Sequence, residues 1–225
     1  MVNFGSIASW LGLFGIIVFA ISGTLVAGRK RMDLFGIVVV AIVTSIGGGT
    51  VRDLILGIHP VFWIEEPVYI LLTAATAFVT FFAARSIRFP SRPLLLFDAF
   101  GLALFTILGC QRALAQGVSP VIVVLMGVLT GVAGGVMRDL LCGEIPLILR
   151  REVYATASLA GGIVFVTLPL LGLSQEGASM AGIAVALGIR LAAIRWRVDL
   201  PVYRGKEDIA GVGGGEDAER DGGRG

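Results

Sequence analysis

Seven long stretches of this sequence carry almost no charged residue, and they constrain the fold more than any other feature. They lie near residues 6–27, 34–57, 66–84, 94–112, 119–142, 153–172 and 177–195. Each approaches the roughly 20 apolar residues that an α-helix needs to cross a bilayer. They are too long for barrel strands and lack the alternation of polar and apolar residues that such strands show. The sequence therefore predicts an all-α integral membrane protein with seven transmembrane helices.

Composition agrees with this prediction and excludes several classes of protein. Charged residues make up 15% and hydrophobic residues 56% of the chain, whereas a soluble domain is roughly a quarter charged. A net charge of +2 without a basic tract indicates no nucleic-acid partner. Cys110 and Cys142 lie in apolar runs, which favours small buried side chains over a disulfide. One histidine without a Cys/His cluster predicts no metal or other cofactor.

Basic residues in the connecting segments predict the orientation. The loops after the first, third and fifth stretches and the C-terminal flank hold most of them, namely Arg29, Lys30, Arg31, Arg85, Arg88, Arg92, Arg150, Arg151, Arg195, Arg197, Arg204 and Lys206. The opposite side has only Arg112 and Arg52. Short basic loops stay in the cytoplasm, so we expect the N-terminus outside and the C-terminus inside the plasma (cell inner) membrane. The polar segment 198–225 is predicted to be a disordered cytoplasmic tail.

The sequence contains an internal repeat. Residues 47–60 (GGGTVRDLILGIHP) and 133–146 (AGGVMRDLLCGEIP) are identical at seven of fourteen positions at a shift of 86. Upstream, Phe19-x-x-x-Gly23 resembles Phe97-x-x-x-Gly101 at a shift of 78.

An odd number of helices in each copy turns the second copy upside down. We therefore expect an inverted 3+3 repeat, with residues 1–92 and 93–173 as its halves. The seventh helix, in residues 174–197, stands outside the repeat and is expected to brace the bundle.

Glycines cluster within the second and fifth predicted helices, as Gly47, Gly48 and Gly49 and as Gly134 and Gly135. Glycine favours a helix less than alanine by roughly 1 kcal/mol. A loosened backbone in lipid must face protein or water. The clusters thus predict kinks that line a polar interior, and the alternative is close helix packing without a kink.

Five charged residues lie in or beside the apolar stretches: Arg52, Asp53, Arg138, Asp139 and Asp98. A charge in the bilayer is costly, and it is usually functional. Adjacent helix residues point about 100° apart, so we expect the members of each Arg-Asp pair to pair elsewhere or to face water. The alternative places both pairs at helix ends near headgroups. Asp98 is expected either to line a pore or to pair with an arginine.

Hydroxyl side chains beside the glycines are weaker candidates. Thr44, Ser45 and Thr50 surround the first cluster and Thr130 precedes the second. They are predicted to line a wet path or to take part in gating. The alternative is that they bond back to their own helices.

The doubled motif consists of Gly47-Gly48-Gly49-Thr50-x-Arg52-Asp53 and Gly134-Gly135-x-x-Arg138-Asp139. With this motif and its seven-span layout, the sequence resembles the prokaryotic TRIC (trimeric intracellular cation) channels over roughly residues 5–196. The resemblance implies a homotrimer in membrane lipid with a water-filled pore in each protomer, bends at the glycines, and passage of monovalent cations, chiefly potassium (K⁺). It leaves open whether bound lipid regulates the channel. Ala133 replaces the first glycine of the second cluster, which suggests a shallower bend there.

Two functional hypotheses follow from the sequence. The first is a cation channel lined by hydroxyls, carbonyls and carboxylates. The second is a secondary transporter of a small solute such as glycine, because inverted repeats with interrupted helices also suit alternating access. An enzyme is not expected, since the sequence contains no nucleophile–base set, metal motif or nucleotide loop.

Overall fold

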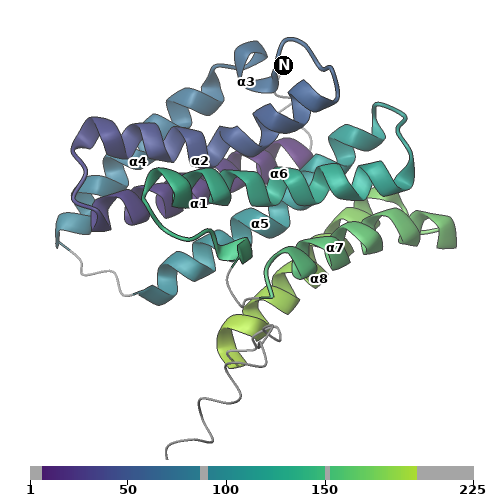
Figure 1. Cartoon of the computed structure of the whole chain (residues 1–225). Coiled ribbons are helices and arrows are strands. Elements are labelled where there is room, and N and C mark those ends of the chain that lie inside the picture. Colours follow the sequence, from purple (N-terminus) through teal and green to yellow (C-terminus); the bar gives the residue numbers. More distant parts are fainter. Residues whose placement is uncertain (1–6, 87–90, 150–152, 197–225) are drawn as a thin grey trace, which may run out of the picture.

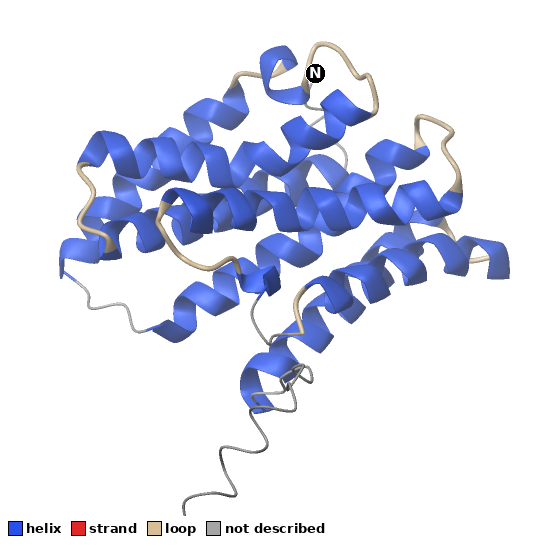
Figure 2. Cartoon of the chain, in the orientation of Figure 1, coloured by secondary structure: helices blue, strands red, loops and turns tan. Residues whose placement is uncertain are grey.

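The structure is a computed structural model that describes residues 7–86, 91–149 and 153–196. All secondary structure in this part is helical (Figures 1 and 2). In chain order the elements are α1 (Ile7–Arg29), α2 (Leu34–Ile55), α3 (Phe62–Glu65), α4 (Val68–Ser86), α5 (Ser91–Leu114), α6 (Pro120–Leu141), the 3₁₀ turn η1 (Leu147–Leu149), α7 (Ala155–Thr167), the 3₁₀ turn η2 (Leu168–Leu171) and α8 (Gln175–Trp196). The prediction of an all-helical protein is confirmed.

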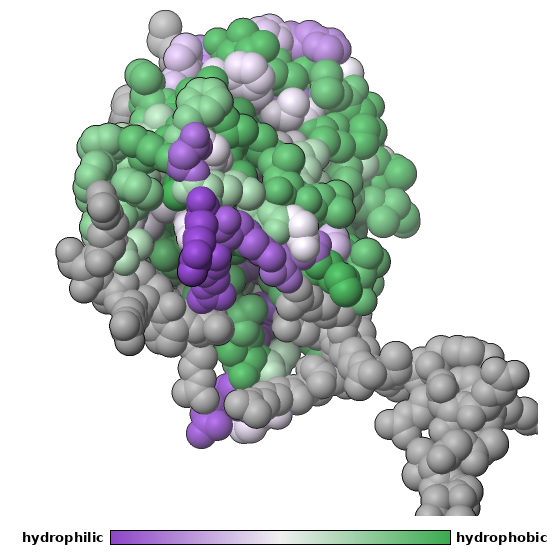
Figure 3. All heavy atoms as spheres, turned by 60° about the vertical axis from the view of Figure 1, so that its left-hand side comes forward, coloured by the Kyte–Doolittle hydropathy of each residue, from purple (hydrophilic) through white to green (hydrophobic). Residues whose placement is uncertain are grey.

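The outer surface is that of a membrane protein. Helices α1, α2, α5, α6 and α8 are long and apolar enough to cross a bilayer, and α4 and the α7–η2 segment are shorter apolar helices. Large apolar side chains such as Phe35, Leu71 and Leu170 are mostly exposed. Figure 3 shows hydrophobic residues over most of one face, around a compact hydrophilic patch. The chain is a multi-pass membrane protein, and the number of seven crossings stays a prediction.

Local sequence sets several helix boundaries. Asp33 caps α2, because its Oδ1 accepts a hydrogen bond of 2.7 Å from the backbone N–H of Gly36. Pro120 begins α6 at a position where its missing N–H costs nothing. Gly57 and Gly143 follow the ends of α2 and α6 with φ of 68° and 65°. This left-handed conformation favours glycine and stops both helices in the same way.

Helices α2 and α6 lie side by side at the centre of the bundle (Figure 1). A Cβ on Gly48 would overlap the carbonyl oxygen of Thr130, and a Cβ on Gly134 would overlap that of Thr44. Along α2 from Thr44 to Gly48, the contacted residue of α6 moves backward from Gly134 to Thr130, so the two helices run antiparallel. Glycine is therefore required at this crossing for close backbone approach.

Both helices continue without interruption through their glycines, from Leu34 to Ile55 and from Pro120 to Leu141. The packing alternative thus accounts for Gly48 and Gly134. The predicted kinks and the inverted repeat itself stay predictions.

A second reciprocal contact defines how the two halves align. A Cβ on Gly15 would touch the ring of Phe105, and a Cβ on Gly101 would overlap the ring of Phe19. Both pairs of equivalent positions, Gly15 with Gly101 and Phe19 with Phe105, are separated by 86 residues. The upstream shift of 78 expected from sequence is therefore wrong, since α1 and α5 keep the same register as α2 and α6.

Helix α8 packs against α7 and α5. A Cβ on Gly161 would lie 2.7 Å from the carbonyl oxygen of Gly182, and a Cβ on Gly182 would lie 2.8 Å from that of Gly161. This contact fits the bracing role expected for the last helix. Cys110 and Cys142 are buried free thiols, as predicted. The predicted tail, residues 198–225, lies outside the described residues.

Candidate functional site

The repeated Arg-Asp pairs form the same local structure at the ends of α2 and α6. The Nε of Arg52 donates to Asp53 Oδ1 at 2.9 Å, and the Nε of Arg138 donates to Asp139 Oδ1 at 2.8 Å. The expectation that neighbours on the helix could not pair is wrong. An arginine in the last helical turn is long enough to curl back to the next residue, so the 100° between their directions does not separate the charges.

The second carboxylate oxygen of each pair organises the segment after its helix. Asp53 Oδ2 accepts the backbone N–H of Phe62 at 3.1 Å, and Asp139 Oδ2 accepts that of Leu147 at 3.0 Å. Phe62 begins α3 and Leu147 begins η1. Each aspartate therefore ties the chain beyond the helix end back to the helix, which is a structural role for the repeated motif.

Arg138 has further partners that Arg52 lacks. Its Nη1 donates to Asp98 Oδ1 and to Ser22 Oγ, both at 2.6 Å. Arg138 is 1% exposed and Asp98 is fully buried. One guanidinium thus faces the carboxylates of Asp98 and Asp139 away from water, an arrangement of short, charge-assisted bonds. Of the two roles left open for Asp98, the structure shows the pairing with arginine.

A second layer of buried polar residues surrounds this network. The hydroxyl of Tyr154 lies 2.9 Å from where a Cβ on Gly135 would be. The guanidinium of Arg190 lies 4.9 Å from the centre of the Tyr154 ring and donates to the carbonyl of Val153 at 3.3 Å. Arg190 belongs to α8 and is 1% exposed. Helix α8 therefore contacts the surroundings of the Arg138 network through a cation–π pair.

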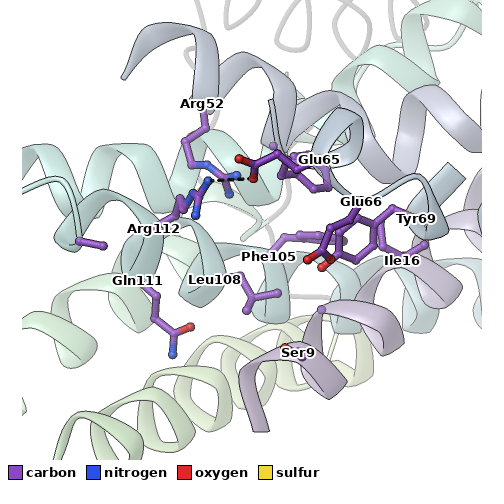
Figure 4. A pocket seen from close by; sticks show the side chains of 14 residues that line it. Ser9, Ile16, Arg52, Glu65, Glu66, Tyr69, Phe105, Leu108, Gln111 and Arg112 are labelled. Carbon is purple, nitrogen blue, oxygen red and sulfur yellow. Dashed lines mark ion pairs between the residues drawn. The ribbon is translucent and has the colours of Figure 1, made fainter. Parts of the chain in front are cut away.

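An open cavity of about 350 Å³ lies at the opposite end, where α2 and α5 end and α1 begins (Figure 4). Its charged lining residues are Arg52, Glu65, Glu66 and Arg112. The large apolar and aromatic lining residues are Ile16, Phe62, Tyr69, Phe105 and Leu108. Glu65 and Arg112 approach to 3.9 Å across the cavity. The end of α2 thus borders open space, whereas the end of α6 is filled by side chains.

The repeat explains this difference between the two ends. At a shift of 86, Asp98 and Ser22, which bind Arg138, correspond to Gly12 and Leu108. Gly12 and Leu108 line the cavity next to Arg52. Because the first copy lacks a carboxylate and a hydroxyl at these positions, the space that is filled beside Arg138 stays open beside Arg52.

The hydroxyl candidates lie within the helices. Thr44, Thr50 and Thr130 donate to carbonyls one turn earlier, those of Val40, Ile46 and Met126, at 2.6, 2.8 and 2.6 Å. Ser45 donates across to the carbonyl of Ile16 at 3.2 Å. Of the candidate residues, Gly49 and Arg52 line the cavity, whereas Gly47 faces the Met137 side chain. Their roles in a pore stay predictions.

The sequence did not identify Glu65, Glu66 and Arg112 as site residues, and it did not predict that Phe19 stacks on Phe105, with the ring centres 5.1 Å apart. Charged residues beyond the apolar stretches are common, and phenylalanines within such stretches carry no signal. The predicted topology did place Arg112 and Arg52 on one side of the membrane. That placement is the sequence feature that could have indicated that both arginines border one cavity.

These features define a class of protein: an all-helical, multi-pass membrane protein whose halves enclose buried ion pairs and a charged cavity. A family model described as "Glycine transporter" matches residues 9–85 and 95–169, one segment in each predicted half. The UPF0126 inner membrane protein YadS of Escherichia coli (strain K12) is 47% identical over 196 residues, which cover 86% of this chain and 95% of YadS.

Solved structures are similar over nearly the whole described chain. The TRIC trimeric intracellular cation channel orthologue from Rhodobacter sphaeroides is 48% identical, with a TM-score of 0.82, over 85% of this chain and 99% of that one. A TRIC cation channel structure described in terms of its conductance is 34% identical, with a TM-score of 0.80, over 89% and 99% of the two chains. The chain belongs to the TRIC family.

Proposed function

We propose that this protein is a monovalent cation channel, mainly for potassium, with one pore in each protomer of a homotrimer. The observation that carries the proposal is the similarity, at 48% and 34% identity over 85% and 89% of this chain, to structures described as cation channels. Those proteins are channels rather than enzymes, which agrees with the prediction of a non-enzymatic chain.

The geometry supports a path along one face of α1. Gly12 and Ile16 line the cavity, Phe19 stacks on Phe105, and Ser22 binds Arg138. Gly12 and Ser22 are ten residues apart, or about 15 Å along a helix. The path therefore begins in the open cavity, meets the stacked phenylalanines near the middle and ends at the buried ion-pair network. We infer that movement of Phe19, Phe105 and Arg138 opens it.

The charge balance at the closed end suits cations. Arg138 carries one positive charge, and it faces two carboxylates, Asp98 and Asp139, at 2.6 and 2.8 Å. If Arg138 swings aside on opening, the two carboxylates are left beside the path and attract cations. This assigns Arg138 the role of a plug rather than of a permanent pore lining.

The test is the reversal potential of the purified protein in planar bilayers under a KCl gradient. We expect it near the potassium equilibrium potential, and a value near that of chloride would refute cation conduction. Subunit cross-linking of the same preparation tests the trimer. Labelling of single cysteines on the two sides tests the proposed orientation, with the N-terminus and the cavity outside the cell inner membrane.

The description of the matching family model favours a second candidate, a secondary transporter of a small solute such as glycine. A transporter takes up its solute in a saturable, coupled manner and shows no unitary current steps. Uptake of labelled glycine into proteoliposomes, measured beside single-channel recording, separates the two candidates.

A further inference from the structure

The cavity at the end of α2 has the properties of a small-molecule site. Its volume of about 350 Å³ falls within the range of ligand pockets, roughly 300–1,000 Å³. It brings two acidic and two basic side chains to one opening above an apolar wall (Figure 4). A conduction path for cations does not require arginine at its mouth, so this combination calls for another explanation.

Arg112 supplies a carboxylate-binding group. Its Nε is buried and has no hydrogen-bond partner within the described part of the chain. Its contact with Glu65 is loose, at 3.9 Å, and both side chains are partly exposed. Arg52, in contrast, is engaged by Asp53 through Nε at 2.9 Å and Nη2 at 2.8 Å. Arg112 is therefore the arginine with donors available to a planar, bidentate anion.

The opposite wall suits an ammonium group. Glu66 follows α3, and its side chain lies beside Tyr69 (Figure 4). The rings of Tyr69 and Phe62 are 5.3 Å apart and both line the cavity. A carboxylate and aromatic rings in one cavity can together bind an ammonium ion, through charge and through cation–π attraction.

The remaining wall indicates what lies between the two charged groups of the ligand. Ile16, Phe105 and Leu108 form an apolar surface that suits an apolar part of a ligand. A simple anion would meet the carboxylates of Glu65 and Glu66, and an organic cation without a carboxylate would leave the Nε of Arg112 without a hydrogen-bond partner. A molecule that carries both charges satisfies both walls.

We propose that this cavity binds a small zwitterion of the α-amino acid class with an apolar side chain. Its carboxylate lies on Arg112, its ammonium group lies between Glu66 and Tyr69, and its side chain lies on Leu108 and Phe105. Glycine has no side chain for this wall and binds more weakly. The proposal goes beyond ion conduction, because it places an organic ligand at the mouth of the proposed path.

The test is isothermal titration calorimetry of the purified full-length protein in detergent with L-leucine. Three matched probes are glycine, which lacks the side chain, 3-methylbutylamine, which lacks the carboxylate, and 4-methylpentanoate, which lacks the ammonium group. We expect L-leucine to bind and each probe to bind about tenfold more weakly or worse, since each loses a charge-assisted bond or the apolar contact. Absence of leucine binding to folded protein, or equal binding of 3-methylbutylamine, overturns the proposal.

Variants locate the site. Arg112→Gln should weaken leucine binding about tenfold or more while leaving the binding of 3-methylbutylamine, which has no carboxylate, nearly unaffected. Glu66→Gln should weaken leucine binding about tenfold or more while leaving the binding of 4-methylpentanoate, which has no ammonium group, nearly unaffected. Arg195→Gln, at an exposed position in the last turn of α8, is the matched control and should bind leucine normally. Gel filtration verifies that each variant is folded. Unchanged leucine affinity in a folded Arg112→Gln protein overturns the assignment.

A zwitterionic lipid headgroup shares this chemistry, and nanodiscs distinguish the two sources. Leucine binding that falls in phosphatidylethanolamine nanodiscs relative to phosphatidylglycerol nanodiscs identifies the headgroup as the occupant of the zwitterion site. Equal binding in both identifies a free amino acid. Potassium current, recorded separately, keeps the two proposals apart: current without leucine binding rejects this inference alone.

Discussion

The two repeated arginines should contribute unequally to stability, although their local sequences match. Arg138 contacts Asp98, Asp139 and Ser22 at 1% exposure. Replacing it with glutamine leaves two carboxylates buried without their counter-charge. Breaking a buried ion pair by removing one partner costs about 3–5 kcal/mol. We expect Arg138→Gln to lower the free energy of unfolding by that amount.

Arg52→Gln is the matched control. Arg52 contacts one carboxylate, that of the buried Asp53, whereas Arg138 contacts two, and Arg52 borders the open cavity, from which water can enter when its side chain is shortened. Loss of hydrogen bonds to a charged group costs about 1–3 kcal/mol. The central values of the two expected losses in free energy of unfolding differ by about 2 kcal/mol, which corresponds to a roughly 30-fold ratio of unfolding equilibrium constants.

The assay is reversible unfolding in mixed micelles by titration with dodecyl sulfate, followed by circular dichroism of the helices. Asp98→Asn combined with Arg138→Gln should be more stable than the sum of the single effects predicts, because the double variant removes both charges of the pair. An Arg52→Gln protein destabilised as much as Arg138→Gln, or strict additivity in the double variant, would refute this account of the network.

Two further predictions concern packing and the helix ends. Gly48→Ala and Gly134→Ala should each destabilise the protein by about 1–3 kcal/mol, because the new Cβ overlaps a carbonyl of the facing helix. Gly28→Ala is the control, because a Cβ there meets no atom within 4 Å in the described part of the chain beyond its own helix. Equal thermal stability of all three variants in detergent would contradict the close crossing. Lys30→Glu should lower the free energy of unfolding by up to about 1 kcal/mol, because it breaks the 2.6 Å ion pair with Glu144. Adding Glu144→Lys should restore stability in the same unfolding assay. No recovery in the double variant would mean that the ion pair contributes nothing.

The helices could be predicted from sequence because the length of an apolar stretch is a local property. The stretches near 34–57 and 119–142 became α2, which spans Leu34–Ile55, and α6, which spans Pro120–Leu141. The short elements α3 and η1 were not predicted, because their positions depend on hydrogen bonds that the backbone N–H groups of Phe62 and Leu147 donate to Asp53 and Asp139. A side-chain acceptor nine or eight residues away leaves no periodic pattern in the sequence.

The site could be predicted only in part for a similar reason. Charge within an apolar stretch identified Arg138 and Asp98, but their pairing depends on how α5 packs on α6. The stacking of Phe19 on Phe105 depends on the contact between the halves, and neither residue differs in type from its apolar neighbours. Sequence therefore showed which residues are costly in a membrane, and the packing of the halves determined their partners.

The difference between the two halves leads to a final prediction. Gly12 corresponds to Asp98 in the repeat, and among the described residues beyond its own helix a Cβ at Gly12 would meet Leu108 Cδ1 alone within 4 Å, at 4.0 Å. Gly12→Asp therefore has room for its carboxylate beside Arg52, and it should reproduce there the pairing that Asp98 makes with Arg138. The cavity would then be narrowed beside Arg52 by a carboxylate, as Asp98 occupies the space beside Arg138 at the other end.

In bilayers, Gly12→Asp should reduce the potassium current by closing the second end of the proposed path, and it should also abolish leucine binding. Gly12→Ala, which adds a Cβ without a charge, is the control and should keep both. If Gly12→Asp is folded and carries the full wild-type current, the cavity is not the entrance to the conduction path. In that case the asymmetry between Arg52 and Arg138 concerns stability alone, because filling the open end would have left ion flow unchanged.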